Sequence, residues 1–363
     1  MFECYKNKVV LITGHTGFKG SWLTSWLLMN GASVYGVSLD PPTSPSAYDS
    51  LALSSKINEV RLNINDHEQL KSVVDEVQPD FVFHLAAQAL VKHSYIDPVA
   101  TWNTNVIGSV NLLDSLTVLD KKCAVVMITS DKCYENKEWV WGYRETDRLG
   151  GVDPYSASKA SAELAISSYC RSILNVRNPN LKISSVRAGN VIGGGDWAAD
   201  RIVPDCIKSW ANGISVNLRM PKSTRPWQHV LEPLSGYMLL GKKLYSGDID
   251  SFQSFNFGPP ADRIQSVELL VETMSKYWDK VTWTSEPDNT DLHEAGLLKL
   301  NCDKALFDLD WSPTLDFEST IHMTVDWYKS FYSGEFDMFK YTTDQIRAFI
   351  LLSNKNDTTK MVL

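Results

Sequence analysis

A short apolar run that leads directly into regularly spaced glycines constrains the fold of this chain more than any other feature. The run Lys8 to Thr13 has the composition of a buried strand, and the glycine segment Gly14 to Gly20 follows it at once. Apolar residues with helical spacing come next, at Trp22 to Asn30, and a second apolar run lies at Ser33 to Leu39. The order strand, turn, helix, strand predicts a βαβ unit of a parallel sheet.

The glycine segment has the spacing G-x-x-G-x-x-G, which in this position favours binding of a dinucleotide. The first glycine permits a tight turn, the second lets the backbone approach a pyrophosphate, and the third allows close packing of the helix. The amino terminus of the helix adds N–H donors and partial positive charge. The predicted cofactor contacts of this segment are Gly14, Gly17, Phe18, Lys19 and Gly20.

Asp40 ends the second apolar run, about 20 residues beyond the last glycine, where a carboxylate can accept hydrogen bonds from the adenosine ribose. The same carboxylate would repel a 2′-phosphate, so NAD is favoured over NADP. The alternative is a polar residue that simply ends a strand before Pro41 and Pro42. Further residues predicted to border the cofactor, each of which could instead be ordinary packing, are Asn63, Ile64, Leu85, Ala86 and Ala87.

Strand-like and helix-like segments alternate through the first half of the chain, which predicts an α/β fold with a doubly wound parallel sheet of the Rossmann type. The domain prediction is an NAD-binding domain at 1–188 and a mainly substrate-binding domain at 189–363, from which 228–260 could return to the first. The further predicted strands are Val60 to Asn63, Phe81 to Leu85, Ala124 to Thr129 and Lys182 to Arg187. The further predicted helices are Asp66 to Val77, Asn103 to Leu119, Ala157 to Ser172, Gln228 to Ser246, Val267 to Trp278 and Thr320 to Phe331, followed by a frayed tail at Ser353 to Lys360.

Composition excludes several other classes of protein. Hydrophobic residues make up 44% and charged residues 21% of the 363 residues, which is typical of a globular protein. A net charge of -8 argues against a nucleic-acid partner. The apolar runs are shorter than the roughly 20 residues of a membrane helix, so we expect a cytoplasmic protein without a membrane partner. The six cysteines form no C-x-x-C pair, which predicts reduced thiols and no metal site.

Tyr155 and Lys159 stand four residues apart, so on a helix they share one face. A nearby ammonium and a positive nicotinamide would lower the pKa of the phenol, which could then take a proton from a substrate hydroxyl. The spacing alone is weak evidence, but it lies downstream of a nucleotide-binding pattern. The strand before it ends in Thr129 and Ser130, and the Ser130 hydroxyl would face the same site.

These motifs, in this order, resemble the extended short-chain dehydrogenase/reductase superfamily over most of the chain. Within it, the segment Thr129 to Tyr134 is similar to the one in which sugar 4,6-dehydratases carry an acid and a base. Lys132 stands where a glutamate is usual, which departs from the general pattern but resembles the CDP-glucose branch. The resemblance implies catalytic roles for Ser130, Asp131, Lys132, Tyr155 and Lys159.

The resemblance also implies substrate contacts in both halves of the chain. Asn190 matches an asparagine that contacts the sugar diphosphate, and Arg201 and Arg225 match arginines that would neutralise it. For each arginine the alternative is a surface ion pair. His93, close after Gln88, could face the sugar or could be a structural histidine.

The implied reaction turns CDP-glucose into CDP-4-keto-6-deoxyglucose and water on a bound NAD. Such enzymes supply deoxysugars for bacterial surface polysaccharides such as the O-antigen of lipopolysaccharide, and they form homodimers or homotetramers. The nearest alternative is an NAD-dependent nucleotide-sugar epimerase, which needs no acid and base for elimination. A nucleotide-binding regulator without catalysis is a third hypothesis.

Overall fold

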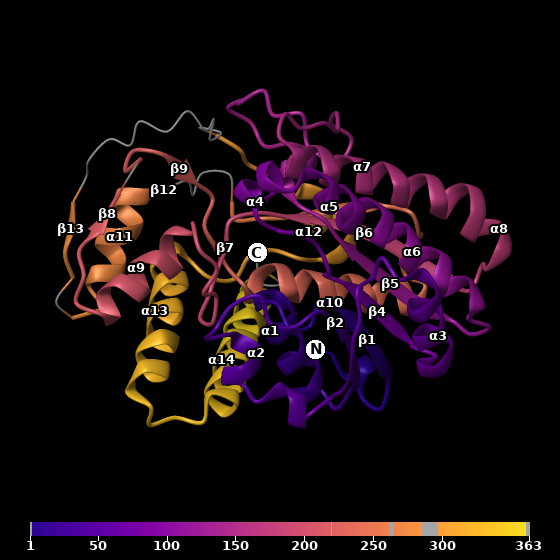
Figure 1. Cartoon of the computed structure of the whole chain (residues 1–363), viewed down its shortest axis with the longest axis horizontal. Helices are drawn as coiled ribbons and strands as arrows, with labels where there is room; N and C mark the ends of the chain where they lie inside the picture. Colours follow the sequence, from indigo (N-terminus) through magenta and orange to yellow (C-terminus); the bar gives the residue numbers. More distant parts are fainter. Residues whose placement is uncertain (1, 219, 261–264, 280, 285–296, 361–363) are drawn as a thin grey trace.

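A seven-stranded parallel sheet forms the centre of the molecule (Figure 1). The computed structural model describes residues 2–218, 220–260, 265–279, 281–284 and 297–360. The strand order is β11-β6-β5-β4-β1-β2-β3, and every neighbouring pair is parallel. The strands of this sheet are β1 (Val9–Thr13), β2 (Ser33–Ser38), β3 (Asn58–Arg61), β4 (Phe81–His84), β5 (Cys123–Ile128), β6 (Leu181–Ala188) and β11 (Ser254–Phe257). The predicted doubly wound α/β fold is therefore confirmed.

Alternate side chains of each strand point to opposite sides of the sheet, so each face of the sheet has its own hydrophobic core. Val10 and Ile12 of β1 lie in one core cluster, while Leu11 between them lies in another. The first core contains residues of α1 (Phe18–Met29), α10 (Leu231–Ser246), α12 (Asp303–Leu309), α13 (Phe317–Ser333) and α14 (Met338–Lys360). The second contains residues of α3 (His67–Val77), α6 (Gly108–Ser115) and α7 (Pro154–Tyr169).

The smaller elements gather mainly beyond the carboxyl ends of the strands. Two-residue strands pair as β7 with β10, β8 with β13 and β9 with β12. Figure 1 shows β8, β9, β12, β13, α9 and α11 together on the left, away from the main sheet. Their bounds are β7 (Val191–Ile192), β8 (Val216–Asn217), β9 (Thr224–Arg225), β10 (Gln228–His229), β12 (Gln265–Ser266), β13 (Trp283–Thr284), α9 (Ile202–Ala211) and α11 (Val267–Ser275). The short helices elsewhere include α2 (Ala47–Ser50), α4 (Val91–Ile96), α5 (Pro98–Trp102), the π-helical turn η3 (Asn103–Ile107), the 3-10 turn η5 (Asp131–Cys133), the π-helical turn η6 (Cys170–Leu174) and α8 (Asn175–Arg177).

The chain returns to the main sheet after residue 228. Helix α10 packs against β5 and β6, and β11 pairs with β6 at the edge of the sheet. The predicted helix Asn103 to Leu119 is confirmed as a continuous helical segment as far as Val118, but its turns differ, since a π-helical turn precedes α6 and a 3-10 turn follows it.

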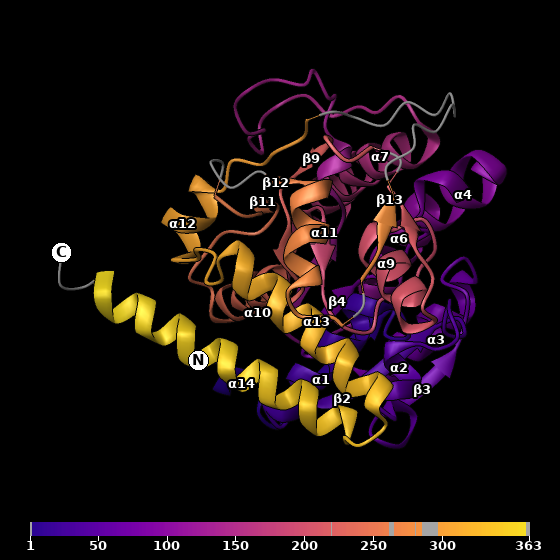
Figure 2. The same ribbon diagram turned by 90° about the vertical axis from the view of Figure 1, so that its left-hand side faces the viewer.

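The last helix differs from the expectation of a frayed end. Helix α14 continues to Lys360, so the prediction of a frayed tail at Ser353 to Lys360 is wrong. Figure 2 shows α14 lying beside α13 and α1. Phe349 packs edge-on against Trp26 of α1 with ring centroids 5.8 Å apart, and Ile346 is fully buried. These apolar contacts anchor the helix, and no glycine or proline follows to end it.

Candidate active site

The glycine segment forms a tight turn between β1 and α1. Gly14 has a φ of +79°, and a Cβ on it would lie 2.6 Å from the backbone nitrogen of Ala86. A Cβ on Gly20 would lie 2.2 Å from the carbonyl oxygen of Gly14. Gly17 is the N-cap of α1 and has no side chain to satisfy the first-turn amides. Those amides, including the ones of Phe18 and Lys19, are therefore available to an anionic ligand.

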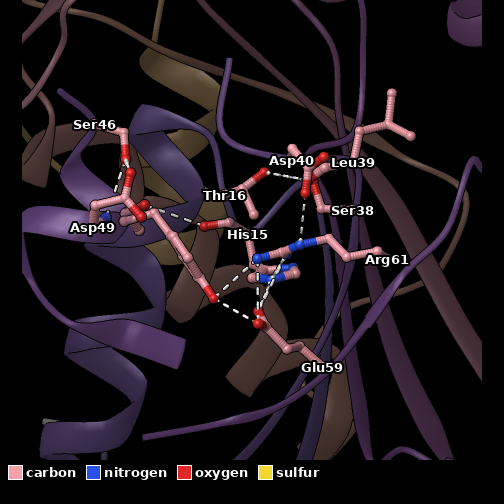
Figure 3. Close-up of polar contacts among 11 residues, drawn as sticks. His15, Thr16, Ser38, Leu39, Asp40, Ser46, Asp49, Glu59 and Arg61 are labelled. Carbon is pink, nitrogen blue, oxygen red and sulfur yellow. Dashed lines mark hydrogen bonds and ion pairs between the residues drawn. The ribbon is translucent and has the colours of Figure 1, made fainter. Parts of the chain in front are cut away.

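Asp40 lies just beyond β2, at the same edge of the sheet. Its side chain is 90% exposed, and Oδ1 accepts a contact from Arg61 Nε at 3.2 Å. Thr16 of the glycine segment hydrogen-bonds Ser38 at 2.7 Å, which holds the turn against the end of β2 (Figure 3).

The other predicted cofactor neighbours differ in their burial. Asn63 is exposed, while Ile64 is buried. The Ile64 side chain lies against Gly108, where a Cβ would come within 2.4 Å of it. Leu85, Ala86 and Ala87 follow β4 and are half-buried, and the amide of Ala86 donates to Thr13 Oγ1 at 3.3 Å.

Tyr155 and Lys159 both lie near the start of α7, and both side chains are buried. The helix begins there because Asp153 accepts a hydrogen bond from the amide of Ser156 at 2.9 Å and Pro154 occupies the first turn. The amide of Tyr155 donates to Ser94 Oγ of α4 at 3.1 Å. The predicted shared face of this pair thus lies inside the molecule.

Burial dominates the electrostatics of this pair. It raises the pKa of Tyr155 to about 12, although the hydrogen-bonding contact with the Ser130 hydroxyl and the charge of Arg201 act to lower it. Burial also lowers the pKa of Lys159 to about 8, against the opposing charge of Glu163. In the protein alone, desolvation of the phenolate outweighs the contact with Ser130 and the charge of Arg201, so the pKa shift of Tyr155 is upward, whereas the expected lowering comes from an ammonium together with a bound nicotinamide.

Ser130, Asp131 and Lys132 follow the carboxyl end of β5 and lie next to Tyr155. Ser130 Oγ donates to Asp131 Oδ1 at 3.0 Å and accepts from the amide of Lys132 at 3.3 Å. Asp131 is buried and Lys132 is half-buried. Through its hydrogen bond with Ser130, the phenol of Tyr155 is connected to this turn.

Gly189, which follows β6, lies against the carboxylate of Asp131. A Cβ on Gly189 would lie 1.8 Å from Asp131 Oδ2, so only glycine leaves room for the carboxylate. This contact was not predictable from local sequence patterns, since the two residues are far apart along the chain. Asn190 follows it with a left-handed φ of +48°, and its carbonyl accepts from the amide of Gln228 at 3.3 Å.

Two cations approach the same cluster from other elements. Arg201, at the N-cap of α9, donates to Asp196 Oδ2 at 2.7 Å. Burial acts to lower the pKa of Arg201, but Asp196 and the phenol of Tyr155 hold it above its ordinary value. Burial lowers the pKa of Lys19 to about 8, and the charge of Arg201 adds to the effect. The site therefore joins α1, α7, α9 and the turn after β5.

Of three further predicted substrate contacts, one is exposed and two are hydrogen-bonded to other groups of the protein. His93 is exposed on α4, and Gln88 donates to Leu90 O at 3.0 Å and to Thr101 Oγ1 at 2.9 Å. Arg225 lies half-buried on β9, where its guanidinium donates to the carbonyl of Thr224 at 2.8 Å.

A buried polar network beneath the site escaped the sequence analysis. Glu163, one turn after Lys159, accepts from Arg187 Nη2 and from Ser185 Oγ, each at 2.8 Å. It also accepts from Thr129, so α7 is tied to β5 and β6. Burial acts to raise the pKa of Glu163, but Arg187 keeps it below its ordinary value. Among the described residues, no group of three or more His, Cys, Asp and Glu side chains has a metal-binding arrangement.

Comparison with known proteins links this geometry to a family. Residues 11–324 match the family described as GDP-mannose 4,6 dehydratase. CDP-glucose 4,6-dehydratase of Salmonella typhimurium is 46% identical over 335 residues, which cover 91% of this chain and 93% of that protein. The dTDP-glucose 4,6-dehydratase of the same organism is 25% identical, with coverage of 88% of this chain and 92% of the relative.

Solved structures share the fold. The UDP-glucose 4-epimerase of Thermus thermophilus, solved as a complex with NAD, superposes with a TM-score of 0.70 at 26% identity, covering 88% of this chain and 99% of the other. Taken with the match over residues 11–324, these comparisons establish that this chain belongs to the GDP-mannose 4,6 dehydratase family of the extended short-chain dehydrogenase/reductase superfamily.

Proposed function

We propose that this chain is an enzyme that converts CDP-glucose into CDP-4-keto-6-deoxyglucose and water with a bound NAD. The observation that carries the proposal is the shared cluster in which Asp131 and Lys132 adjoin the Ser130 and Tyr155 pair. An epimerase needs only the proton transfer of Tyr155, whereas a dehydratase also needs an acid and a base for elimination. The 46% identity to a CDP-glucose 4,6-dehydratase supports the same choice.

The residues at the carboxyl edge of the sheet fit NAD. The turn at Gly14 and Gly20 has no room for a Cβ, and the side-chain-free N-cap Gly17 leaves amides for a pyrophosphate. Asp40 is exposed where a ribose would lie. When bound, NAD supplies the reversible two-electron oxidation and reduction of the sugar. Asn63, Ile64 and the Leu85 to Ala87 segment remain proposed neighbours of this cofactor.

In the first step, Tyr155 takes the proton of the sugar 4-hydroxyl as carbon 4 is oxidised to a ketone. Its contact with the Ser130 hydroxyl and the charge of Arg201 both favour the phenolate. Lys159 lies on the same helical face, and its ammonium would stabilise the phenolate as it forms. The ketone makes the proton on carbon 5 acidic, which prepares the elimination.

In the second step, we assign Lys132 as the base that removes the proton from carbon 5. Asp131 gives a proton to the departing 6-hydroxyl, which leaves as water and leaves a double bond between carbons 5 and 6. The two electrons removed at carbon 4 would then return as hydride to carbon 6 while Lys132 gives its proton back to carbon 5, so the 4-keto-6-deoxy product forms with no net oxidation. Gly189 leaves the space that the Asp131 carboxylate occupies, so this acid keeps a fixed position relative to Ser130. Arg201, Asn190 and Arg225 are the proposed contacts of the substrate diphosphate, and Gln88 and His93 are the proposed contacts of the sugar.

Two further parts of the proposal concern assembly and setting. Apolar side chains of α4, α5, η3 and α7 are exposed, namely Tyr95, Ile96, Val99, Trp102, Ile107 and Leu164. Their exposure on neighbouring helices supports a homodimer or homotetramer paired through this face.

No helix within the described residues is long and apolar enough to cross a bilayer. We propose a cytoplasmic enzyme that supplies deoxysugars for surface polysaccharides such as the O-antigen of lipopolysaccharide, with 1–188 plus 228–260 binding NAD and the remaining part of 189–363 binding substrate.

The test is to incubate the purified protein and NAD with CDP-, dTDP-, GDP- and UDP-glucose in turn, and to follow the 4-keto product. We expect rapid product formation with CDP-glucose and slow formation with the others. Conversion of UDP-glucose to its 4-epimer, with no ketone, would favour the epimerase. Binding of a nucleotide sugar without turnover of any of them would favour the regulator.

A further inference from the structure

Arg61 at the end of β3 lies directly beside Asp40, although the two residues come from different strands. Its Nε approaches Asp40 Oδ1 at 3.2 Å, and the Asp40 side chain is 90% exposed on its other sides. Figure 3 shows the two side chains pointing toward each other, and Arg61 is the last residue of β3 while Asp40 follows β2 by two residues. The carboxylate proposed to meet the adenosine ribose therefore already has a cation as its partner.

Other groups fix the direction in which the Arg61 guanidinium points. Glu59 accepts from Nη1 and from Nη2, each at 3.2 Å, and Tyr48 Oη accepts from Nη2 at 3.1 Å. The guanidinium carbon lies 5.0 Å from the centre of the Tyr48 ring. Because both Nη atoms are hydrogen-bonded to Glu59 or Tyr48, the Nε–H is the donor that is directed at Asp40.

A buried histidine anchors this arrangement from beneath. His15 is fully buried, and its Nε2 lies 2.7 Å from Glu59 Oε2 and 3.2 Å from Arg61 Nη1. It fits there because Gly36 has no Cβ, which would otherwise lie 2.4 Å from His15 Nδ1. Burial lowers the pKa of His15, so the neutral ring orients Glu59 without adding charge.

We propose that Arg61 is the second half of a cofactor-selectivity pair: it holds the Asp40 carboxylate toward the adenosine ribose, and it is itself a latent binding site for a 2′-phosphate. This inference rests on the proposed NAD site. With Asp40 present, the carboxylate takes the Nε–H and repels a phosphate. Without Asp40, the Nε–H is free in a fixed direction, and a phosphate dianion is the ligand that an arginine edge binds well.

The pair also defines the net charge that a ribose substituent meets. Asp40, Glu59 and Arg61 together carry about one negative charge when His15 is neutral. Removing the Asp40 carboxylate leaves Glu59 and Arg61, whose charges cancel. The change thus removes a repulsion and frees a donor at the same time, while His15, Tyr48 and Glu59 keep the guanidinium in place.

The test uses direct binding to the full chain rather than turnover. The probes are ADP-ribose and 2′-phospho-ADP-ribose, which differ only in the 2′-phosphate, and binding is measured by isothermal titration calorimetry. The variants are Asp40→Ser, Arg61→Met and Asp40→Ser combined with Arg61→Met. Methionine keeps the length of the side chain against Tyr48, and the unfolding temperature of each variant verifies that it folds.

We expect the parent chain to prefer ADP-ribose and Asp40→Ser to bind 2′-phospho-ADP-ribose at least about tenfold more tightly than the parent does. Adding Arg61→Met to Asp40→Ser should abolish that gain, and Arg61→Met alone should weaken ADP-ribose severalfold. Equal affinity of Asp40→Ser and the double variant for the phosphorylated probe would overturn the role of Arg61. A parent chain that prefers the phosphorylated probe would overturn the pair as a whole. If the parent chain bound neither probe, the cofactor site and the proposed function would fail instead.

Discussion

The cofactor side and the substrate side of the site are held in place by different means. On the cofactor side, the missing Cβ atoms of Gly14 and Gly20 let the backbone close on itself. On the substrate side, side chains hold one another, as where Asp196 pairs with Arg201 at 2.7 Å. The cofactor side is therefore fixed by short-range sequence and tolerates little change, while the substrate side can be altered one interaction at a time.

The largest expected effect lies where the two sides meet, at Tyr155. Replacing Tyr155 with Phe removes only the ionisable oxygen, so turnover should fall by about 10³-fold, in the range of lost acid–base catalysis. Binding of CDP-glucose, measured by titration calorimetry, should stay within about twofold of the parent because the ring and its packing remain. The matched control is Tyr95→Phe, which removes an exposed phenol of α4 and should leave turnover unchanged. A Tyr155→Phe variant with turnover near that of the control would refute the assignment.

The cofactor side should yield a large effect on stability. Gly20→Ala forces a Cβ to within 2.2 Å of a carbonyl oxygen, whereas Gly17→Ala brings it only to 3.4 Å. We expect Gly20→Ala to lower the free energy of unfolding by about 2 kcal/mol more than Gly17→Ala does, as strained packing usually does. Urea unfolding followed by tryptophan fluorescence measures both. Equal losses for the two variants would show that the turn is not fixed by its backbone.

The substrate side should yield an effect mainly on binding. Arg201→Gln removes a charged donor at the proposed diphosphate contact, so the KM for CDP-glucose should rise by about tenfold or more, while kcat falls less because the charge of Arg201 is only one of the influences that favour the Tyr155 phenolate. Its control is Arg171→Gln, because Arg171 is exposed on the turn η6. Should kcat fall while KM stays constant, Arg201 would act on the reaction step and not on the diphosphate.

The remaining expected effect appears only in acid and concerns the support of the glycine turn. His84 lies beneath it, 2.6 Å from Thr13 Oγ1 through Nδ1, and burial lowers its pKa to about 3. The unfolded chain takes up a proton near the ordinary pKa of about 6.5, so the folded state loses stability as pH falls below it, by up to about 2 kcal/mol at pH 5. His84→Gln should reduce this loss of stability at low pH but not abolish it, because burial also lowers the pKa of His229 to about 3. The control, exposed His93→Gln, should keep the parental slope.

The parts of the fold that were predictable from sequence are those with short-range causes. The run Lys8 to Thr13 and the glycines after it predict β1, the turn and α1, since the strand pattern and the turn chemistry lie within one stretch of chain. Tyr155 and Lys159 were likewise predictable as neighbours, because one helical turn separates them. The Arg187 and Glu163 pair was not, because residues on β6 and α7 meet only once the sheet has formed.

Other features depended on distant packing and were missed for that reason. A return of 228–260 to the first domain is open from sequence, but the strand β11 within it is not predictable, because β11 joins the main sheet only through β6. The tail from Ser353 is polar, yet α14 extends through it because Ile346 and Phe349 anchor the helix earlier. The pKa of Tyr155 rose because burial of the phenol, which the sequence does not reveal, outweighs the cations near it.

The assignment of Lys132 is the central claim, and one measurement tests it most directly. In a single turnover of Lys132→Met with CDP-glucose in deuterated water, absorbance reports cofactor reduction, and mass spectrometry reports deuterium at carbon 5. We predict reduction at nearly the parental rate, with exchange and water release slowed by about 10²-fold or more, as expected when a general base is lost. Exchange and elimination at the parental rate in the methionine variant would contradict the assignment and remove the residue that most separates a dehydratase from an epimerase.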